Sequence, residues 1–119
     1  MSNTVYWLLE TIIKDGESEN LKALMDEMVS ATKENEPGAI IYDWSVSEDG
    51  KKCNILEMYK DSEAVMNHMG IFGKNYAARF MSILEIKKYV CYGNPDEKVV
   101  SALSKLGVVF MKPLGGFHR

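Results

Sequence analysis

The stretch EPGAIIYDWSVSEDGKKCNILEMYKDSEAVMNHMGIFGKNYAARFMSIL, Glu36 to Leu84, decides the fold. After a Glu-Pro-Gly turn come two segments rich in β-branched and aromatic residues, at 39–47 and 52–59. The turn residues Glu48-Asp49-Gly50 separate them, which predicts a β-hairpin. Asp61 is the expected N-cap of a helix, because an aspartate accepts hydrogen bonds from the free amides of the first helical turn. The stretch therefore predicts a turn, a hairpin and a helix in that order.

The residues before this stretch predict one more strand and one more helix. Residues 4–14 are rich in β-branched and aromatic side chains and end at the turn signal Asp15-Gly16. Ser18 is the expected N-cap of a helix that must finish before Pro37. Its apolar side chains recur at the spacing of one helical face: Leu21, Leu24, Met25, Met28 and Val29.

The second helical region is expected to continue to about residue 82, with a break near Gly70 and Gly73. A fourth strand is predicted at 83–92, where a Gly-Asn-Pro turn follows. The order β-α-β-β-α-β is that of the ferredoxin-like α+β fold, one sheet with its helices on one face.

The chain continues beyond this pattern. We expect a single domain over residues 1–119, with a core at 4–93 and an extension at 94–119. Apolar residues between Val99 and Leu106 predict a short helix in the extension, and residues 108–111 a short strand.

Both faces of the predicted sheet are apolar. The first strand places two apolar sets on opposite sides, Val5, Trp7, Leu9 and Ile13 against Tyr6, Leu8 and Ile12. In the second strand, Ile40 and Tyr42 are expected on one side and Ile41 on the other. A sheet that is apolar on both sides must be covered on both. The helices cover one face, and we expect a second copy of the chain to cover the other, in a twofold homodimer.

Composition and charge argue against several classes of function. The net charge of −3, without a basic cluster, argues against nucleic-acid binding. No run of apolar residues is long enough to span a membrane, and no signal peptide is recognisable. Cys53 and Cys91 are expected to be buried thiols in a cytoplasmic protein. They do not have the paired spacing with His68 or His118 that a zinc site needs, so no metal site is expected.

One set of residues has an ordered spacing: Glu36-Pro37-Gly38-x-x-x-Tyr42, then Glu57-x-Tyr59-x-Asp61-x-x-Ala64-x-x-x-His68, then Phe72 and Phe80. In these residues the chain resembles the antibiotic biosynthesis monooxygenase family, over about residues 5–90. The resemblance implies a dimeric α+β barrel, with a ligand pocket in each subunit between the sheet and the helices. It also implies oxidation of an aromatic or quinol-type compound by molecular oxygen, without metal, flavin or haem. The extension 94–119 is not part of the family pattern.

Haem-degrading proteins of the wider superfamily differ from this chain in the second helix. They carry a tryptophan in that helix and a histidine beyond it. Here the helix has Asn67-His68-Met69 and no tryptophan, and the next histidine is His118. A haem-degrading activity is therefore not expected.

His68 and Glu57 are the candidate catalytic residues. A histidine titrates near neutral pH and is suited to taking the proton of a phenol or quinol, which prepares the anion for reaction with oxygen. Glu57 lies in the middle of a predicted strand and can orient His68. Each also has a structural explanation: His68 as a helix-packing residue, and Glu57 as a hydrogen-bonded or exposed strand residue.

Four aromatic residues are the candidate substrate-binding residues: Tyr42, Tyr59, Phe72 and Tyr76. The two strand tyrosines can hydrogen-bond a substrate oxygen, and they are equally well explained as core aromatics. The two helical residues are spaced i, i+4 with Phe80 next, which is also typical of simple helix packing.

The sequence leaves three functions open. The first is a cofactor-independent monooxygenase for a small aromatic, quinol-type or polyketide-like compound. The second is a non-catalytic dimeric protein that binds a small hydrophobic ligand in the same pocket. In the third, methionine and phenylalanine side chains close the pocket and the protein is a structural dimer module.

Overall fold

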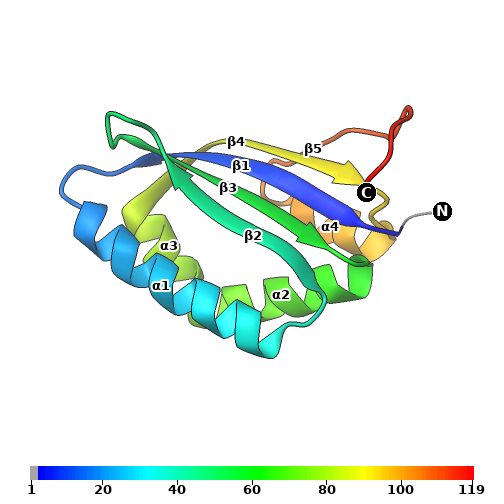
Figure 1. Cartoon of the computed structure of the whole chain (residues 1–119), viewed down its shortest axis with the longest axis horizontal. Helices are drawn as coiled ribbons and strands as arrows, with labels where there is room; N and C mark the ends of the chain where they lie inside the picture. The colour runs from blue at the N-terminus through cyan, green and yellow to red at the C-terminus, as the bar shows by residue number, and fades with distance from the viewer. Residues whose placement is uncertain (1–2) are drawn as a thin grey trace.

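The structure, a computed structural model, describes residues 3–119. Its elements follow each other along the chain (Figure 1) as β1 (Val5–Ile13), α1 (Ser18–Asn35), β2 (Ala39–Val46), β3 (Lys52–Tyr59), α2 (Ser62–Asn75), α3 (Ala77–Ile83), β4 (Leu84–Gly93), α4 (Glu97–Ser104) and β5 (Val109–Phe110). Within this part of the chain, every helix is too short or too polar to cross a lipid bilayer.

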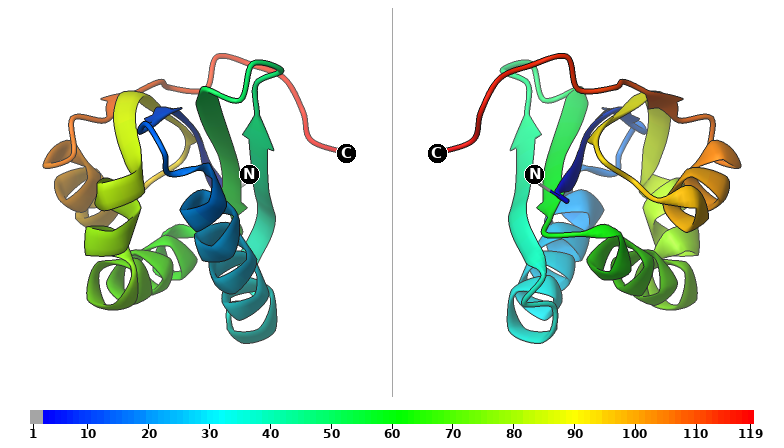
Figure 2. Two further views of the ribbon diagram at one scale, coloured as in Figure 1. Left: turned by 90° about the vertical axis from the view of Figure 1, so that its left-hand side faces the viewer. Right: turned by 90° about the vertical axis from the view of Figure 1, so that its right-hand side faces the viewer.

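The strands form one sheet in the order β2-β3-β1-β4-β5. Neighbouring strands are antiparallel, except for β4 and β5, which pair in parallel. The helices pack against one side of this sheet (Figures 1 and 2). The predicted ferredoxin-like α+β fold is thus confirmed, and the extension adds a helix and a short edge strand to it.

The register of the sheet separates a helix-facing side from an open side. One row on the helix-facing side contains Tyr42, Glu57, Trp7 and Cys91, which are partners on adjacent strands. The neighbouring row on the open side contains Asp43, Leu56, Leu8 and Val90. The two sets of β1 alternate as predicted, because Val5, Trp7, Leu9 and Ile13 are all buried in the core between sheet and helices.

Two predicted helix boundaries are wrong. Helix α1 begins at Ser18 itself, and the capping position is Glu17, whose side chain makes no capping hydrogen bond. The second helical region is continuous through Gly70 and Gly73 and breaks at Tyr76 instead. The backbone of Tyr76 leaves the helical conformation at φ −130° while its amide still bonds to the Phe72 carbonyl. Asp61, in contrast, caps α2 as predicted, since its carboxylate accepts a hydrogen bond from the Ala64 amide at 2.9 Å.

The alternation predicted for the second strand is also wrong at Ile40. The register of β2 against β3 shifts between Ala39 and Ile41, which leaves Ile40 as an extra residue in the strand. Ile40 is 54% exposed, and Ala39 takes the position opposite Tyr59. Tyr42 nevertheless lies on the helix-facing side, opposite Glu57.

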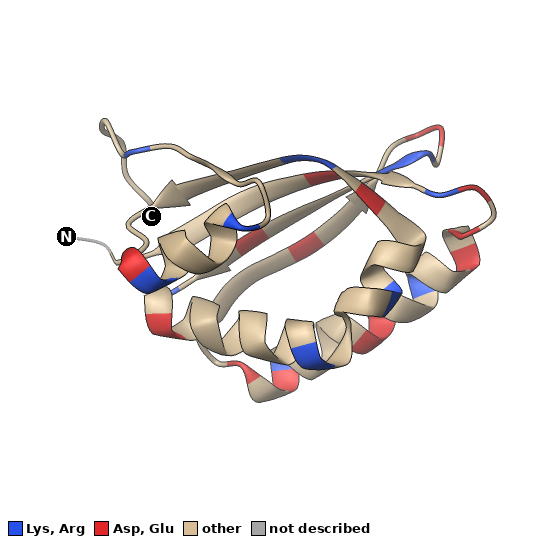
Figure 3. Cartoon of the chain, turned by 180° about the vertical axis from the view of Figure 1, so that it is seen from behind, with Lys and Arg blue, Asp and Glu red and all other residues tan. Residues whose placement is uncertain are grey.

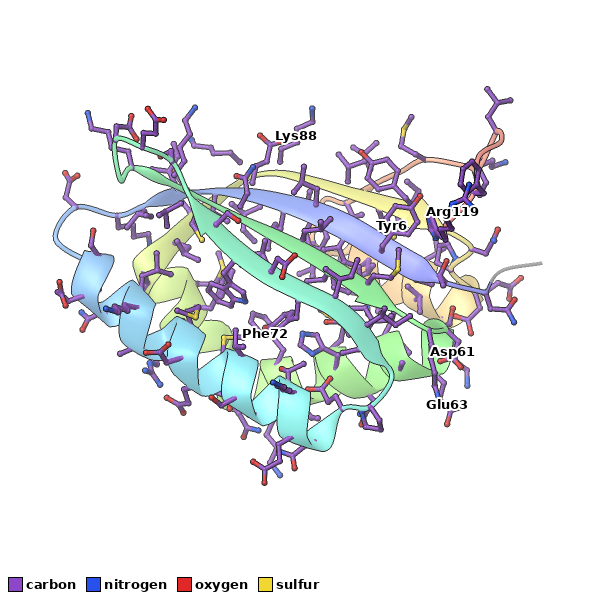
Figure 4. The ribbon with its side chains drawn as sticks, viewed as in Figure 1. Tyr6, Asp61, Glu63, Phe72, Lys88 and Arg119 are labelled. Atoms are coloured by element: carbon purple, nitrogen blue, oxygen red, sulfur yellow. The ribbon has the colours of Figure 1, made fainter. Side chains whose placement is uncertain are left out.

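The open side of the sheet carries apolar side chains and part of the C-terminal tail. Tyr6 and Tyr92 stack there with ring centroids 5.3 Å apart, and the ring of His118 meets the edge of Tyr6 at 5.2 Å. Figure 4 shows Tyr6 and Arg119 close together at this end of the sheet. Several large apolar side chains remain exposed on β1, β3 and the extension: Ile12, Leu56, Val109 and Met111.

Candidate functional site

The candidate site lies between the sheet and α2. Tyr42 and Glu57 face each other across β2 and β3, and Glu57 in turn lies opposite Trp7 on β1. Because α2 begins directly after the Asp61 cap, its buried face presents Val65 and His68 to this row of the sheet. The hairpin register and the helix cap together position the site.

His68 is 4% exposed and lies between two carboxylates. Its Nδ1 is 2.9 Å from Oε1 of Glu36, and its Nε2 is 3.4 Å from Oε1 of Glu57. An ionised carboxylate only accepts hydrogen bonds, so Nδ1 donates in the contact with Glu36. The other ring nitrogen, Nε2, faces Glu57.

Glu57 is buried and contacts two other titratable groups, the Tyr59 hydroxyl and the His68 ring. Its Oε1 accepts a hydrogen bond from the Tyr59 hydroxyl at 2.6 Å. Burial raises the pKa of the Glu57 carboxyl above its ordinary value, while His68 and the Tyr59 hydrogen bond oppose this rise. A carboxyl whose pKa is raised by burial and which lies beside a histidine is the arrangement that an acid–base pair requires.

The tyrosines of the site remain protonated. Burial, and then the charge of Glu57, raise the pKa of the Tyr42 hydroxyl and that of the Tyr59 hydroxyl far above the ordinary value. Both groups can therefore act as hydrogen-bond donors and not as bases. The Tyr42 ring meets the His68 ring edge-on at 5.4 Å, and the Tyr59 ring lies 5.1 Å from it.

Two indole N–H groups are buried at the site without a hydrogen-bond partner among residues 3–119, those of Trp7 and Trp44. The Trp7 indole is close enough to Glu57 to lower the pKa of its carboxyl, although it is not aligned for a hydrogen bond. The Trp44 indole is likewise close enough to the Tyr42 hydroxyl to lower its pKa, and it too is not aligned for a hydrogen bond. A buried donor without an acceptor is costly, so these groups are suited to a ligand that brings oxygen acceptors.

An apolar cavity of about 150 Å³ opens beside these residues. Glu57, His68 and Tyr42 lie in its wall. The rest of the lining is apolar or aromatic: Trp7, Leu9, Met28, Trp44, Ile55, Met69, Phe72, Ala77, Phe80, Met81, Ile86, Tyr89 and Leu106. Phe72 extends from α2 toward the sheet (Figure 4), and its ring meets Phe80 at 5.3 Å. The cavity thus combines an acid–base pair with aromatic walls.

The structure does not bring all the candidate residues to this cavity. Tyr59 is fully buried behind Glu57 and contacts the site through its hydroxyl. Tyr76 lies on the other side of Phe72, where it lines a separate cavity of about 40 Å³ between α1 and α2. Tyr76 stands at the break between α2 and α3.

Sequence reasoning missed three residues of the site. Glu36 was interpreted as part of a turn and of the family pattern and was given no role in the site, yet it is 6% exposed and bonds His68. Trp7 and Trp44 were assigned no chemistry, and both line the cavity. The alternation of β1 does predict that Trp7 faces the core, but no sequence pattern predicts a buried carboxylate at the end of α1.

The acidic groups of the site do not form a metal site. Across residues 3–119, no three His, Cys, Asp or Glu side chains are arranged to hold a metal ion. At His68 the reason is geometric, because Glu36 and Glu57 approach opposite nitrogens of its ring. Cys53 and Cys91 are buried and unpaired.

The fold and the site define a small α+β protein with an apolar cavity between its sheet and its helices. Residues 6–70, more than half of the chain, match the sequence profile of the antibiotic biosynthesis monooxygenase family, and the protein belongs to this family. No curated protein sequence matches the chain.

Two solved structures illustrate the likeness in fold. MupZ from Pseudomonas fluorescens is 22% identical, with a TM-score of 0.86 over 99% of this chain and 96% of its own. Rv0793 from Mycobacterium tuberculosis is 26% identical, with a TM-score of 0.66 over 79% of this chain and 97% of its own. The likeness to MupZ therefore includes the extension after β4.

Proposed function

We propose that the protein is a cofactor-independent monooxygenase that oxidises a small aromatic, quinol-type or polyketide-like compound with molecular oxygen. The observation that carries this proposal is the position of His68 and Glu57. Both are buried, they lie within 3.4 Å of each other, and both border an apolar cavity. Membership of a monooxygenase family supports the same reaction class.

His68 and Glu57 act together as the base. The Nε2 atom of His68 takes the proton of a substrate hydroxyl or activated C–H group, and Glu36 stabilises the imidazolium through Nδ1. Glu57 lies beside Nε2 and accepts or returns this proton. The low polarity of the cavity disfavours charge, so a neutral base and a neutral substrate enter the reaction more readily than ions do.

The substrate itself then supplies the electrons. Its anion passes one electron to O2, and the resulting radical combines with superoxide to form a peroxide on carbon. Protonation of the outer oxygen and cleavage of the O–O bond place one oxygen atom in the product as a carbonyl and release the other as water. For a CH2 group, CH2 and O2 give C=O and H2O, so no further reductant is needed.

The remaining candidate residues hold the substrate. Tyr42 donates a hydrogen bond to a substrate oxygen, and Phe72 contacts its ring from α2. Tyr59 orients the Glu57 carboxylate through their hydrogen bond of 2.6 Å. Tyr76 supports Phe72 from the neighbouring cavity, and its role in binding is therefore indirect.

Oxygen consumption by the purified protein tests this function. We expect uptake above the rate of autoxidation with at least one member of a panel of alkylphenols, hydroquinones, naphthalenediols and anthrone. With isotopically labelled O2, one labelled atom should appear in the product and one in water. A rate equal to autoxidation for every compound would contradict the proposal.

The second candidate function is non-catalytic binding of a small hydrophobic ligand. The two unpartnered indole N–H groups favour it, because they need an acceptor whether or not the ligand is oxidised. Ligand-dependent quenching of tryptophan fluorescence without oxygen uptake would favour this function over the first.

We also propose that the protein is a homodimer that pairs through the open side of its sheet. Leu56 and Leu8 are neighbours there, with Val90 and Val109 next to them in the same row. An exposed apolar sheet face of this kind is typical of an interface between protein chains.

Two buried free thiols agree with a location in the cytoplasm.

Sedimentation of two lysine variants tests the dimer. Leu56→Lys places a charge in the middle of the open side, and we expect it to produce monomers at micromolar concentration. Met66→Lys on α2 is the matched control, since Met66 is 37% exposed and Leu56 is 40% exposed. The control and the unchanged protein should both sediment as dimers. A monomeric unchanged protein would overturn the proposal.

A further inference from the structure

The cavity has the size of one aromatic ring. An apolar cavity of about 150 Å³ binds benzene, whereas drug-sized ligands occupy about 300 Å³ or more. The cavity beside His68 measures about 150 Å³, so a tricyclic compound does not fit inside it. Any substituent on a ring bound there has to extend out of the cavity.

The most exposed side chains of the lining lie on α3 and in the extension, and we take them to mark the opening of the cavity. Most of the lining is buried or half-buried, but Met81 on α3 and Leu106 in the extension are 45% and 46% exposed. Figure 3 shows α3 and the segment between α4 and β5 on the same side of the molecule. Together, Met81 and Leu106 form what we call the mouth of the cavity.

Glu57 and Ile86, which both line the cavity, lie at different positions along the sheet. Glu57 is opposite Trp7 on β1, and Ile86, which also lines the cavity, is opposite Thr11. Four residues of a strand separate these two positions, which corresponds to about 13 Å. A ring whose oxygen reaches Glu57 can therefore extend its far substituent along the sheet toward Ile86.

We propose that the ligand is a phenol or quinol with a single ring and an apolar substituent, which leaves the cavity between Met81 and Leu106. The oxygen of the ring meets Glu57, His68 and Tyr42, and the substituent contacts the apolar side chains of the mouth. Leu106 belongs to the extension, so the extension determines which substituents are accepted. This inference deepens the proposed function and rests on it for the oxidation of the ligand.

The position of Leu106 is fixed by the local backbone. Its amide donates to the Leu103 carbonyl at 2.9 Å, which continues the last turn of α4. Gly107 follows at φ +76°, a conformation that favours glycine and ends the turn. Leu103 is fully buried, so α4 anchors the mouth on the core.

Binding can be measured without oxidation, because both tryptophans of the chain line the cavity. Under anaerobic conditions, we expect tryptophan fluorescence to report binding of phenol, para-ethylphenol and para-pentylphenol, with affinity rising along this series. Each methylene group buried at the mouth adds apolar contact, so para-pentylphenol should bind at least about tenfold more tightly than phenol. Anthrone should bind at least about tenfold more weakly than para-pentylphenol.

One substitution at the mouth isolates the contribution of the substituent. Leu106→Asp should reduce the affinity for para-pentylphenol about tenfold and leave that for phenol unchanged. Leu114→Asp is the matched control, because Leu114 is fully exposed in the tail and should change neither affinity. Equal losses for phenol and para-pentylphenol, or tight binding of anthrone, would overturn the inference.

The outcomes separate this inference from the proposed function. If the affinity rises with the length of the substituent but no oxygen is consumed, the proposed ligand class is supported and the proposed monooxygenase activity is contradicted. If the protein consumes oxygen with anthrone but does not bind para-pentylphenol, the proposed monooxygenase activity is supported and the proposed ligand class is contradicted.

Discussion

Replacement of His68 by glutamine should lower the rate of substrate-dependent oxygen consumption by at least about 100-fold, the usual contribution of a general base. Glutamine has a size close to that of histidine and can still bond Glu36, so the change mainly removes the basic Nε2 atom. The measurement is the initial rate of oxygen uptake at saturating substrate, with autoxidation subtracted. The affinity for para-pentylphenol, measured anaerobically, should change much less than the rate.

His118→Gln is the matched control for this variant, because His118 is the other histidine of the chain. Its ring contacts Tyr6 on the open side of the sheet, away from the cavity. The control should retain the full rate. Equal rates for the His68 variant and the unchanged protein would show that His68 only packs the helix.

Replacement of Gly93 by alanine should lower the free energy of unfolding by about 3 kcal/mol or more, since it combines a left-handed backbone with steric overlap. Gly93 has φ +87°, where a side chain is strained. The added Cβ would also overlap the carbonyl group of Thr4, the residue directly before β1, whose carbon lies 3.1 Å away. Because β1 is central in the sheet, it cannot move aside without disturbing its pairing with β3 and β4. Urea denaturation followed by circular dichroism measures this loss.

Gly16→Ala is the control for the backbone contribution. Gly16 has φ +79°, similar to Gly93, but a Cβ there meets no atom within 4 Å. Its cost should therefore be only about 1 kcal/mol, that of the left-handed conformation alone. If Gly93→Ala and Gly16→Ala lower the free energy of unfolding by the same amount, the overlap with Thr4 contributes nothing to the loss of stability.

The fold could be predicted from the sequence where local chemistry determines it. The turn residues between β2 and β3 and the Asp61 cap specify a hairpin and a helix without reference to the rest of the chain. The break at Tyr76 has no such local signal, because Gly70 and Gly73 are the residues with low helix propensity in this region. Helix α2 nevertheless continues through both glycines, because its buried face, with Val65 and His68, packs on the sheet.

The candidate site was only partly predictable, for a similar reason. Tyr42 and Glu57 come together because the hairpin register pairs them, and His68 follows from the position of the helix cap. The contact of Glu36 with His68 joins residues that are 32 positions apart, at the end of α1 and the middle of α2. That contact depends on how the two helices pack, which no periodicity in a single sequence describes.

The bulge at Ile40 and the short strand β5 together limit how the protein can assemble. Exposed sheet edges invite further strands to add, and a bulge or a very short strand discourages this. Here the β2 edge carries the extra residue Ile40, and the β5 edge ends after two residues, shortly before Pro113, which has no amide hydrogen to offer. Growth of an open-ended fibre along the hydrogen-bond direction is therefore disfavoured at both edges, which leaves the open side of the sheet as the surface for the proposed homodimer.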